Sequence, residues 1–167
     1  MTQNLTVEVT GECIAPVALI ANIPDSQLSG SGYFDSRYHY SRSRLYTQGN
    51  GGSIGGSWAT DSNTVGEYIQ ADFGQLQRIQ TVATQGRHDW DQWMTSYKFA
   101  YSTDGVTYPY VKNADGSDRV FGGSSDRNTV VQHSFDVLVA RFARLYPQTY
   151  YSWTALRWEV YGCSYSG

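Results

Sequence analysis

The end of the chain decides the fold, where the sequence reads Leu156-Arg157-Trp158-Glu159-Val160-Tyr161-Gly162-Cys163. Large apolar side chains stand at every second position from Leu156 to Val160, and charged side chains stand between them. Because successive side chains of a strand point to opposite faces, this alternation predicts a half-buried β-strand. A cysteine follows directly, so the last predicted strand ends at a thiol.

The same alternation recurs earlier in the chain, where Tyr97, Phe99 and Tyr101 interleave with Lys98 and Ala100. Turn signals such as Asp-Gly pairs separate the apolar runs. No segment has a sustained helical period, so the pattern predicts an all-β sandwich or barrel. The further strand-like runs are Leu5–Val9, Tyr68–Phe73, Ile79–Thr84, Arg119–Phe121, Thr129–Phe135 and Arg141–Tyr146.

The composition indicates one folded domain. The chain has 167 residues, which is an ordinary length for a single domain. Hydrophobic residues make up 40% and charged residues 16%, a balance that argues against disorder. The net charge is −3 and the basic residues are scattered, which argues against electrostatically driven nucleic-acid binding. No apolar run approaches the roughly 18 residues of a membrane span.

The two cysteines, Cys13 and Cys163, lie near opposite ends of the chain. One disulfide that ties the ends of a domain explains this placement, and two thiols placed there by chance are the alternative. A closed loop of that length contributes up to about 5 kcal/mol in the chain-entropy account. Together with the sequon Asn4-Leu5-Thr6, the bridge favours an extracellular compartment. Met1–Cys13 has no recognisable signal peptide, so we expect that one was removed or that the sequence was trimmed.

Catalytic motifs are weak. Gly51-Gly52-Ser53-Ile54-Gly55 matches the G-x-S-x-G pattern of hydrolases, and His133 follows it. That pattern works where a strand turns sharply into a helix, whereas Ser53 lies in a glycine-rich run. We therefore predict that the protein is not an enzyme.

Regular metal sites are also not indicated. His88, Asp89 and Asp91 lack the spacing of zinc or EF-hand ligands. Asp89 and Asp91 flank Trp90 and point to opposite sides of an extended chain, unlike the carboxylate pair of glycosidases. We interpret both as solvated loop acids. The sequence is compatible with a structural Ca²⁺ that is held partly by backbone carbonyls.

Two loops, Tyr33–Tyr40 and Gln85–Trp93, combine aromatic rings with Arg, His and Asp side chains. Flat rings and fork-shaped donors suit a pocket for a sugar or a small charged group. One alternative is a membrane-binding surface in which Trp90 and Met94 insert among headgroups. Another is that several of the rings pack beneath the loops. Trp90, between two acids, is the best candidate for an exposed ring.

From Cys13 to Cys163 the chain resembles the discoidin, or coagulation factor V/VIII type C (F5/8 type C), domain family. Many ordered matches make the resemblance specific. They are Ile23–Gln27, Ser43–Leu45, Trp58, Tyr68–Gly74, Thr84–Arg87, Asp91–Lys98, Tyr101–Gly105, Arg119–Phe121, Asp126–Thr129, Ala140–Phe142 and Leu156–Cys163.

The resemblance implies a single eight-stranded, jelly-roll-like β-sandwich of the galactose-binding-domain type, with a disulfide joining its ends. Residues 13–163 then form the domain, between an N-terminal extension over 1–12 and a C-terminal tail over 164–167. Family members are non-catalytic modules that bind ligands through loops at one end of the sandwich. By position, these loops are Phe34–Tyr40, Gly49–Asn63 and Arg87–Trp93.

The family's ligands are phosphatidylserine membranes, glycans such as galactose and N-acetylgalactosamine, collagen, and peptide carboxyl termini. Membrane-binding members have a longer first loop tipped with Trp, Leu or Phe, whereas this chain has a short, polar one. We therefore expect an extracellular adhesion module that binds cell-surface glycans or glycoproteins; anionic phospholipid and protein ligands are the alternatives. The expected ligand-binding residues are Arg37, Tyr38, His39, Trp58, Asn63, Arg87, His88, Trp90 and Trp93.

The resemblance implies no required cofactor, although related carbohydrate-binding modules often hold a structural Ca²⁺, which keeps that ion open. Few groups converge on such a site, so we expect weak binding by each copy. Strong overall binding then needs several copies that act together, and an oligomer is one way to supply them.

Overall fold

Eight strands and four short 3₁₀ helices make up the computed structural model, which describes residues 11–166. The strands are β1 (Val17–Ala18), β2 (Leu28–Gly30), β3 (Trp58–Ala59), β4 (Ile69–Gln85), β5 (Trp93–Ser102), β6 (Phe121–Gly122), β7 (Val131–Tyr151) and β8 (Ala155–Ser164). The 3₁₀ helices are η1 (Ile20–Asn22), η2 (Asp25–Gln27), η3 (Ser36–Tyr38) and η4 (Tyr40–Ser43). The predicted eight-stranded all-β fold is confirmed.

Two predictions, the strand Leu5–Val9 and the sequon at Asn4, lie outside the described residues. Within the described part of the chain, no helix has the length and apolar character needed to cross a membrane.

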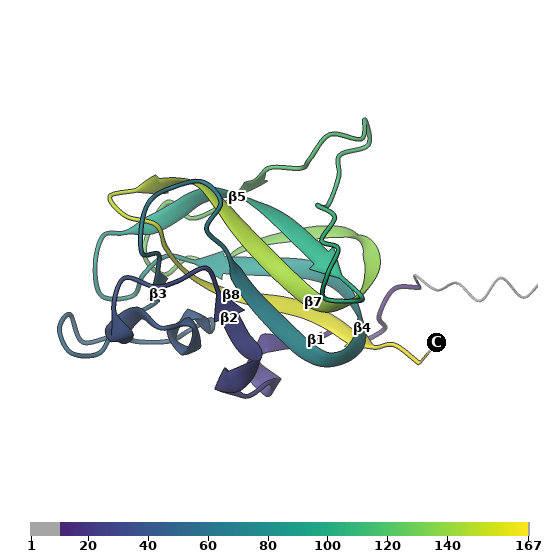
Figure 1. Cartoon of the computed structure of the whole chain (residues 1–167), viewed down its shortest axis with the longest axis horizontal. Helices are drawn as coiled ribbons and strands as arrows, with labels where there is room; N and C mark the ends of the chain where they lie inside the picture. Colours follow the sequence, from purple (N-terminus) through teal and green to yellow (C-terminus); the bar gives the residue numbers. More distant parts are fainter. Residues whose placement is uncertain (1–10, 167) are drawn as a thin grey trace, which may run out of the picture.

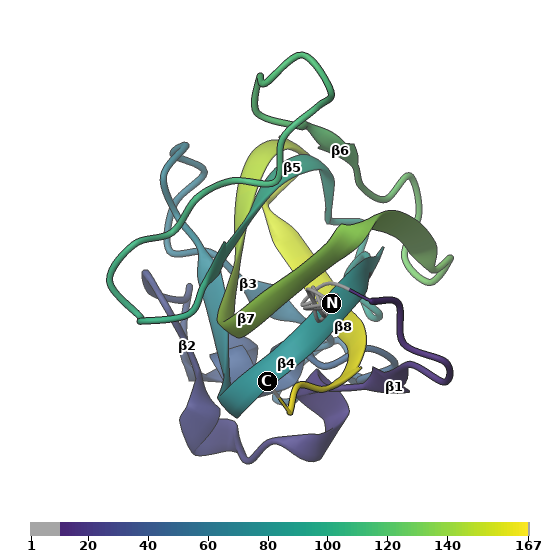
Figure 2. The same cartoon turned by 90° about the vertical axis from the view of Figure 1, so that its right-hand side faces the viewer.

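The strands form two layers because β4 and β7 each bend and contribute one half to each layer (Figures 1 and 2). In the first layer, residues 69–72 of β4 lie between β2 and β7, residues 142–151 of β7 continue along β5, and β5 pairs with β6. In the second layer, residues 77–85 of β4 pair with β8 and with residues 131–140 of β7, and β1 pairs with β8. All of these pairings are antiparallel.

The bend in β4 lies between Asp72 and Gln77, where its pairing with β7 shifts. Gly74 has a φ of 79°, a left-handed conformation that glycine adopts without steric cost. The Gly74 N–H also donates to the Asp72 carboxylate (2.8 Å). The predicted strands Tyr68–Phe73 and Ile79–Thr84 are therefore the two halves of one irregular strand.

Three further strand predictions need adjustment. Arg141–Tyr146 lies within β7, whereas Thr129–Phe135 begins two residues too early, because β7 begins at Val131. The prediction Arg119–Phe121 is wrong at its start, because β6 begins at Phe121. The Arg119 N–H instead donates to the carbonyl of Val111 (3.0 Å), which belongs to the preceding loop.

The core lies between the two layers, and Leu156, Trp158 and Val160 of β8 are fully buried in it. The prediction of a half-buried strand is wrong for the opposite face, because Arg157 and Glu159 are only 1% and 3% exposed. Simple alternation assumes that one face of a strand meets water. Here loops cover that face.

These two charged side chains hold the covering loops in place. The Arg157 guanidinium donates to three backbone carbonyls at 2.6–2.9 Å, those of Thr47, Gly86 and Arg127. Burial lowers the pKa of Arg157 to about 10. The Glu159 carboxylate accepts hydrogen bonds from two N–H groups at η1. Both charges are thereby hydrogen-bonded, which offsets the cost of burying them.

The predicted disulfide between Cys13 and Cys163 is confirmed, with its Cα atoms 5.8 Å apart and a sequence separation of 150. It fastens the start of the described chain to the end of β8. Figure 1 places that end of β8 opposite the end that carries β3.

Replacing both cysteines (Cys13→Ser with Cys163→Ser) should destabilise the domain by up to about 5 kcal/mol, because the bridge restricts a long loop of the unfolded chain. Urea unfolding of the variant and of the oxidised wild type measures the difference. Wild-type protein kept in reductant is the control and should match the variant. A loss below about 1 kcal/mol would contradict this role of the bridge.

Candidate functional site

Four loops gather at the end of the sandwich that lies away from the disulfide (Figure 1). Three of them are the predicted ligand loops. The fourth is the turn between β7 and β8, which contains Trp153. In the first loop, η3 begins after Asp35, whose carboxylate accepts from the N–H of Arg37 (3.0 Å) and caps the helix.

A buried ion pair between Arg87 and Asp89 lies at the centre of this end. Arg87 Nε is 2.6 Å from Asp89 Oδ1, and the two side chains are 10% and 5% exposed. Asp89 also accepts a hydrogen bond from the N–H of Gly51 (2.9 Å). Arg87 donates to the side-chain oxygen of Gln92 and to the hydroxyl of Tyr38, both at 2.9 Å. This ion pair therefore connects the three predicted loops.

Glycines let the second loop approach the ion pair. A Cβ added to Gly56 would lie 2.6 Å from Asp89 Oδ1, and one added to Gly55 would lie 2.1 Å from the carbonyl oxygen of Arg37. Backbone cannot move aside as the end of a flexible side chain can, so no larger residue fits at Gly55. The N–H of His88 donates to the carbonyl of Gly56 (3.1 Å). The glycine-rich run thus allows close packing of the loops.

A cleft of about 230 Å³ opens beside the ion pair. The rings of Phe34 and Trp153 meet edge to face, with their centroids 5.6 Å apart. The Arg87 guanidinium lies 4.6 Å from the centroid of the Tyr38 ring. The cleft therefore presents aromatic surfaces around a fixed cation. Its lining residues are Phe34, Tyr38, Ala59, Arg87, Gln92 and Trp153.

The cleft retains hydrogen-bonding capacity for a ligand. A guanidinium carries five N–H groups, and Arg87 gives one from each of its three nitrogens to protein acceptors, which leaves two. The amide nitrogen of Gln92 has no hydrogen-bond partner within residues 11–166. Apolar walls with a few fixed donors suit a small ligand that has both an apolar face and hydroxyl groups.

The structure brings only two of the predicted ligand residues, Tyr38 and Arg87, into this cleft. Trp90 is 57% exposed and lines a neighbouring hollow of about 240 Å³, beside Tyr151. Trp93 stacks on Tyr151, with the ring centroids 4.7 Å apart. Neither tryptophan lines the cleft, because Trp90 and Trp93 line two other hollows.

Four other predicted residues hold the loops together. The exposed Arg37 pairs with Asp35 (2.7 Å). His39 packs against Tyr33, with the ring centroids 5.0 Å apart. A ring nitrogen of His88 accepts from the N–H of Gly49 (3.1 Å), and the side-chain oxygen of Asn63 accepts from the N–H of Thr154 (2.9 Å).

Three predictions about this end are wrong. Trp58 is fully buried, and its indole N–H donates to the carbonyl of Gly32, so the ring cannot stack on a ligand. Met94 is 1% exposed, so it cannot insert into a membrane. Asp89 is the buried partner of Arg87 and not a solvated loop acid.

Four residues of the cleft were not predicted as ligand contacts, namely Phe34, Ala59, Gln92 and Trp153. The first three lie in the predicted ligand loops. The signal for Trp153 is the aromatic run Tyr150-Tyr151-Ser152-Trp153 between two predicted strands. A ring-rich connection of that kind is unusual for an ordinary turn.

The hydrolase and metal motifs do not assemble into sites. The Ser53 hydroxyl accepts from the Asn50 amide (3.3 Å), and the His133 ring bonds to the carbonyl of Gly122 (2.7 Å). Ser53 and His133 therefore do not form a nucleophile–base pair. Across residues 11–166, no three His, Cys, Asp or Glu side chains cluster so as to hold a metal ion.

Comparison with known proteins adds a family match. Residues 27–160 match the F5/8 type C domain. Mouse (Mus musculus) lactadherin is 34% identical over 158 residues, which cover 90% of this chain and 34% of lactadherin. The structure of discoidin II from Dictyostelium discoideum has a TM-score of 0.80 at 27% identity, over 91% of this chain and 60% of that one. The chain therefore spans only about a third to three fifths of these relatives.

A more distant structure shares the fold. The family 32 carbohydrate-binding module of C. perfringens NanJ, solved with galactose, has a TM-score of 0.58 at 14% identity. The match covers 90% of this chain and all of that module. At this identity the similarity establishes the common fold.

Replacing Asp89 by Asn should destabilise the domain on the order of 3 kcal/mol, because it leaves the Arg87 cation buried without its counter-charge. Asp91→Asn is the matched control two residues away. Asp91 is 65% exposed and pairs with Arg127 at the surface, so its loss should cost less than about 1 kcal/mol. Urea unfolding at neutral pH measures both, and equal effects would contradict the assigned role of Asp89.

The same pair predicts a pH dependence. Burial raises the pKa of Asp89, but hydrogen bonds from Arg87 and from the Gly51 N–H outweigh burial, so the pKa lies below its ordinary value of 3.8. The stabilisation is then complete above pH 3.8 and is lost as the pH falls through the lowered pKa. As the pH falls through this range, the free energy of unfolding should decrease less for Asp89→Asn than for the wild type. Parallel curves of the two unfolding free energies against pH would contradict this assignment.

Proposed function

The chain belongs to the F5/8 type C domain family, and we propose that it is a non-catalytic, extracellular recognition module that binds carbohydrate in the cleft beside Arg87. Members of this family generally act as binding modules. The disulfide fits an oxidising, extracellular compartment. The cleft itself contributes the preference for a sugar among the ligand classes.

The observation that carries the proposal is the combination of aromatic walls with a fixed, partly unsatisfied guanidinium. The C–H face of a pyranose packs on rings such as Phe34 and Trp153, which meet at the cleft wall. The free N–H groups of Arg87 and the amide of Gln92 then donate to ring hydroxyls. Because Arg87 is already held by three protein groups, it loses little conformational entropy on binding.

Binding by one cleft should be weak. A cavity of about 230 Å³ is small for a ligand pocket and covers little more than one sugar ring. Strong adhesion then requires several copies that act together. We propose that binding needs no cofactor.

A second candidate function is binding to an anionic membrane surface. Large apolar side chains are half exposed on three different loops at this end, namely Phe34 (51%), Ile54 (50%) and Trp90 (57%). Side chains of this kind insert into the interface between headgroups and acyl chains. With Met94 buried, Ile54 and Trp90 are the residues that would insert.

The sugar proposal predicts that Phe34→Ala weakens binding about tenfold or more, because the cleft loses one aromatic wall. A glycan array, run in calcium and again in chelator, identifies the ligand, and calorimetry with that sugar or with galactose measures the affinity. Val106→Ala is the matched control, since Val106 is 83% exposed in the loop after β5.

Three results would count against parts of this proposal. A blank array from folded protein would reject the sugar and shift the assignment to lipid or protein ligands. Equal affinity for Phe34→Ala and Val106→Ala would reject the cleft. Loss of binding in chelator would contradict the proposal that binding needs no cofactor, and it would indicate a calcium site.

Vesicle sedimentation tests the membrane alternative. If the loops insert, the protein should pellet with phosphatidylserine vesicles, and Ile54→Asp should abolish this, because a charge at the loop tip cannot enter the interface. Val106→Asp serves as the control on a loop outside the site. Equal recovery with and without phosphatidylserine would reject this function.

A further inference from the structure

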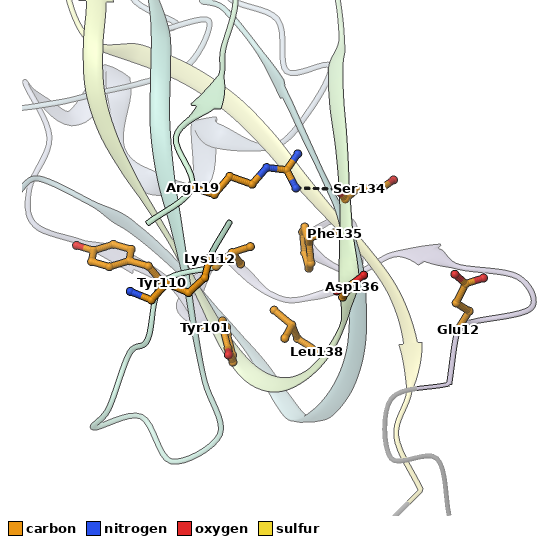
Figure 3. Close-up of a pocket in the computed structure, with 10 residues that line it drawn as sticks. Glu12, Tyr101, Tyr110, Lys112, Arg119, Ser134, Phe135, Asp136 and Leu138 are labelled. Atoms are coloured by element: carbon orange, nitrogen blue, oxygen red, sulfur yellow. Dashed lines mark hydrogen bonds between the residues drawn. The ribbon is translucent and has the colours of Figure 1, made fainter. Parts of the chain in front are cut away.

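A hollow of about 580 Å³ lies away from the ligand loops, between the first half of β7 and the loop that joins β5 to β6 (Figure 3). Its lining carries acids and cations together, Glu12 and Asp136 with Lys112 and Arg119. One of these cations, Arg119, donates to the carbonyl of Ser134 (3.0 Å), as the dashed line in Figure 3 marks. Mixed charges of this kind select no particular ligand.

The hollow next to the ligand cleft, which we call the Trp90 hollow, has a more definite character. Trp90 and Tyr151 are 57% and 53% exposed there. The Tyr151 ring keeps a fixed orientation because it stacks on Trp93, with the centroids 4.7 Å apart. Large rings that are exposed together mark a binding surface. The hollow has a volume of about 240 Å³, and its lining residues are Trp90, Asp91, Arg127, Tyr151 and Ser152.

The two turns that line the ligand cleft also line this hollow. Gln92 belongs to the cleft and Trp90 to the hollow, and the N–H of Gln92 donates to the carbonyl of Trp90 (2.9 Å). In the other turn, Trp153 belongs to the cleft and Tyr151 to the hollow, and the N–H of Trp153 donates to the carbonyl of Tyr151 (2.7 Å). Two residues of a chain span at most about 7 Å, so the cleft and the hollow adjoin.

The second of these turns has a sterically costly conformation. Ser152 has a φ of 65°, in the left-handed region that residues with a Cβ rarely adopt. The turn at Ser152 separates the Tyr151 ring of the hollow from the Trp153 ring of the cleft. Backbone outliers of this kind cluster at ligand sites, where they position the groups that make contact.

The polar side of the Trp90 hollow is an ion pair that is open to solvent. Arg127 Nε lies 2.7 Å from Asp91 Oδ1, and the two side chains are 41% and 65% exposed. Within residues 11–166, the terminal nitrogens of Arg127 and the second carboxylate oxygen of Asp91 have no hydrogen-bond partner. The pair therefore offers donors and an acceptor together and has no net charge. These groups match the hydroxyls of a neutral sugar, each of which both donates and accepts.

We propose that the Trp90 hollow is a second subsite, which binds the neutral sugar unit linked to the one in the cleft. This inference rests on the proposed sugar-binding function. The cleft and the hollow have similar volumes, about 230 and 240 Å³, so each accommodates about one pyranose ring. The protein then recognises a disaccharide unit of a neutral glycan, with the second ring against Trp90 and Tyr151.

The ratio of the affinities for a disaccharide and for its monosaccharide tests the proposal. Calorimetry measures this ratio with two pairs of probes, lactose with galactose and chitobiose with N-acetylglucosamine. In the wild type, the second ring should raise the affinity about tenfold, the amount expected for one further aromatic contact. Trp90→Ala should bring the ratio down to about one, because the second ring loses the surface on which it packs.

Tyr150→Ala is the matched control, because Tyr150 is 44% exposed beside Tyr151 but lines neither the cleft nor the hollow. It should keep the wild-type ratio. Phe34→Ala should weaken the binding of both sugars, since the first ring lies in the cleft. A measurement without variants is the indole N–H signal of Trp90, which should shift with the disaccharide and not with the monosaccharide.

Four results would overturn the proposal. A wild-type ratio near one would show that the second ring makes no contact in the hollow. Equal ratios for Trp90→Ala and Tyr150→Ala would exclude Trp90 as the contact surface. A Trp90→Ala variant that keeps the ratio but no longer pellets with phosphatidylserine vesicles would assign Trp90 to membrane binding. Finally, a protein that binds no sugar at all would reject the proposed function itself, and this inference with it.

Discussion

The ion pair between Arg87 and Asp89 is the interaction on which the arrangement of the candidate ligand loops depends. It is nearly inaccessible to water and has hydrogen-bond partners in all three predicted ligand loops. A buried pair of this kind contributes little net stability compared with apolar packing, but removal of one partner is costly. Its role is therefore to specify one arrangement of loops that carry few regular hydrogen bonds of their own.

A second buried cation, Arg157 of β8, also holds these loops in place. Arg157 projects from the back of β8 and is bonded to carbonyls of three separate segments. Backbone carbonyl dipoles and the nearby charge of Asp89 stabilise its positive charge. Burial lowers the pKa of Arg157, and the charge of Asp89 opposes this lowering. The loops thus rest on a strand whose inner face forms the core and whose outer face holds charges. The cleft is a rigid site on a β-scaffold.

The sequence predicted the scaffold well because its signals are local. Alternation around Trp158 and the position of Cys163 led to the last strand and to the disulfide. Long-range contacts caused the errors. Asp89 reads as a solvated acid because the loop that covers it, with Gly51 and Gly56, is far away in the sequence, although Arg87 is only two residues from it. Trp58 reads as a ligand contact because nothing local marks its burial. Trp153 was missed because Phe34, whose ring it contacts at the cleft wall, comes from the other end of the chain.

The five tryptophan indoles provide the most direct test of the cleft, because each gives its own N–H signal in a nuclear magnetic resonance spectrum. We predict that titration with the sugar that binds best shifts the indole signal of Trp153 and the side-chain amide of Gln92, while the buried Trp58 and Trp158 stay unchanged. Shifts confined to Trp90 and Trp93 would place the ligand in the neighbouring hollow. That result would contradict the claim that the ion pair between Arg87 and Asp89 organises the binding site.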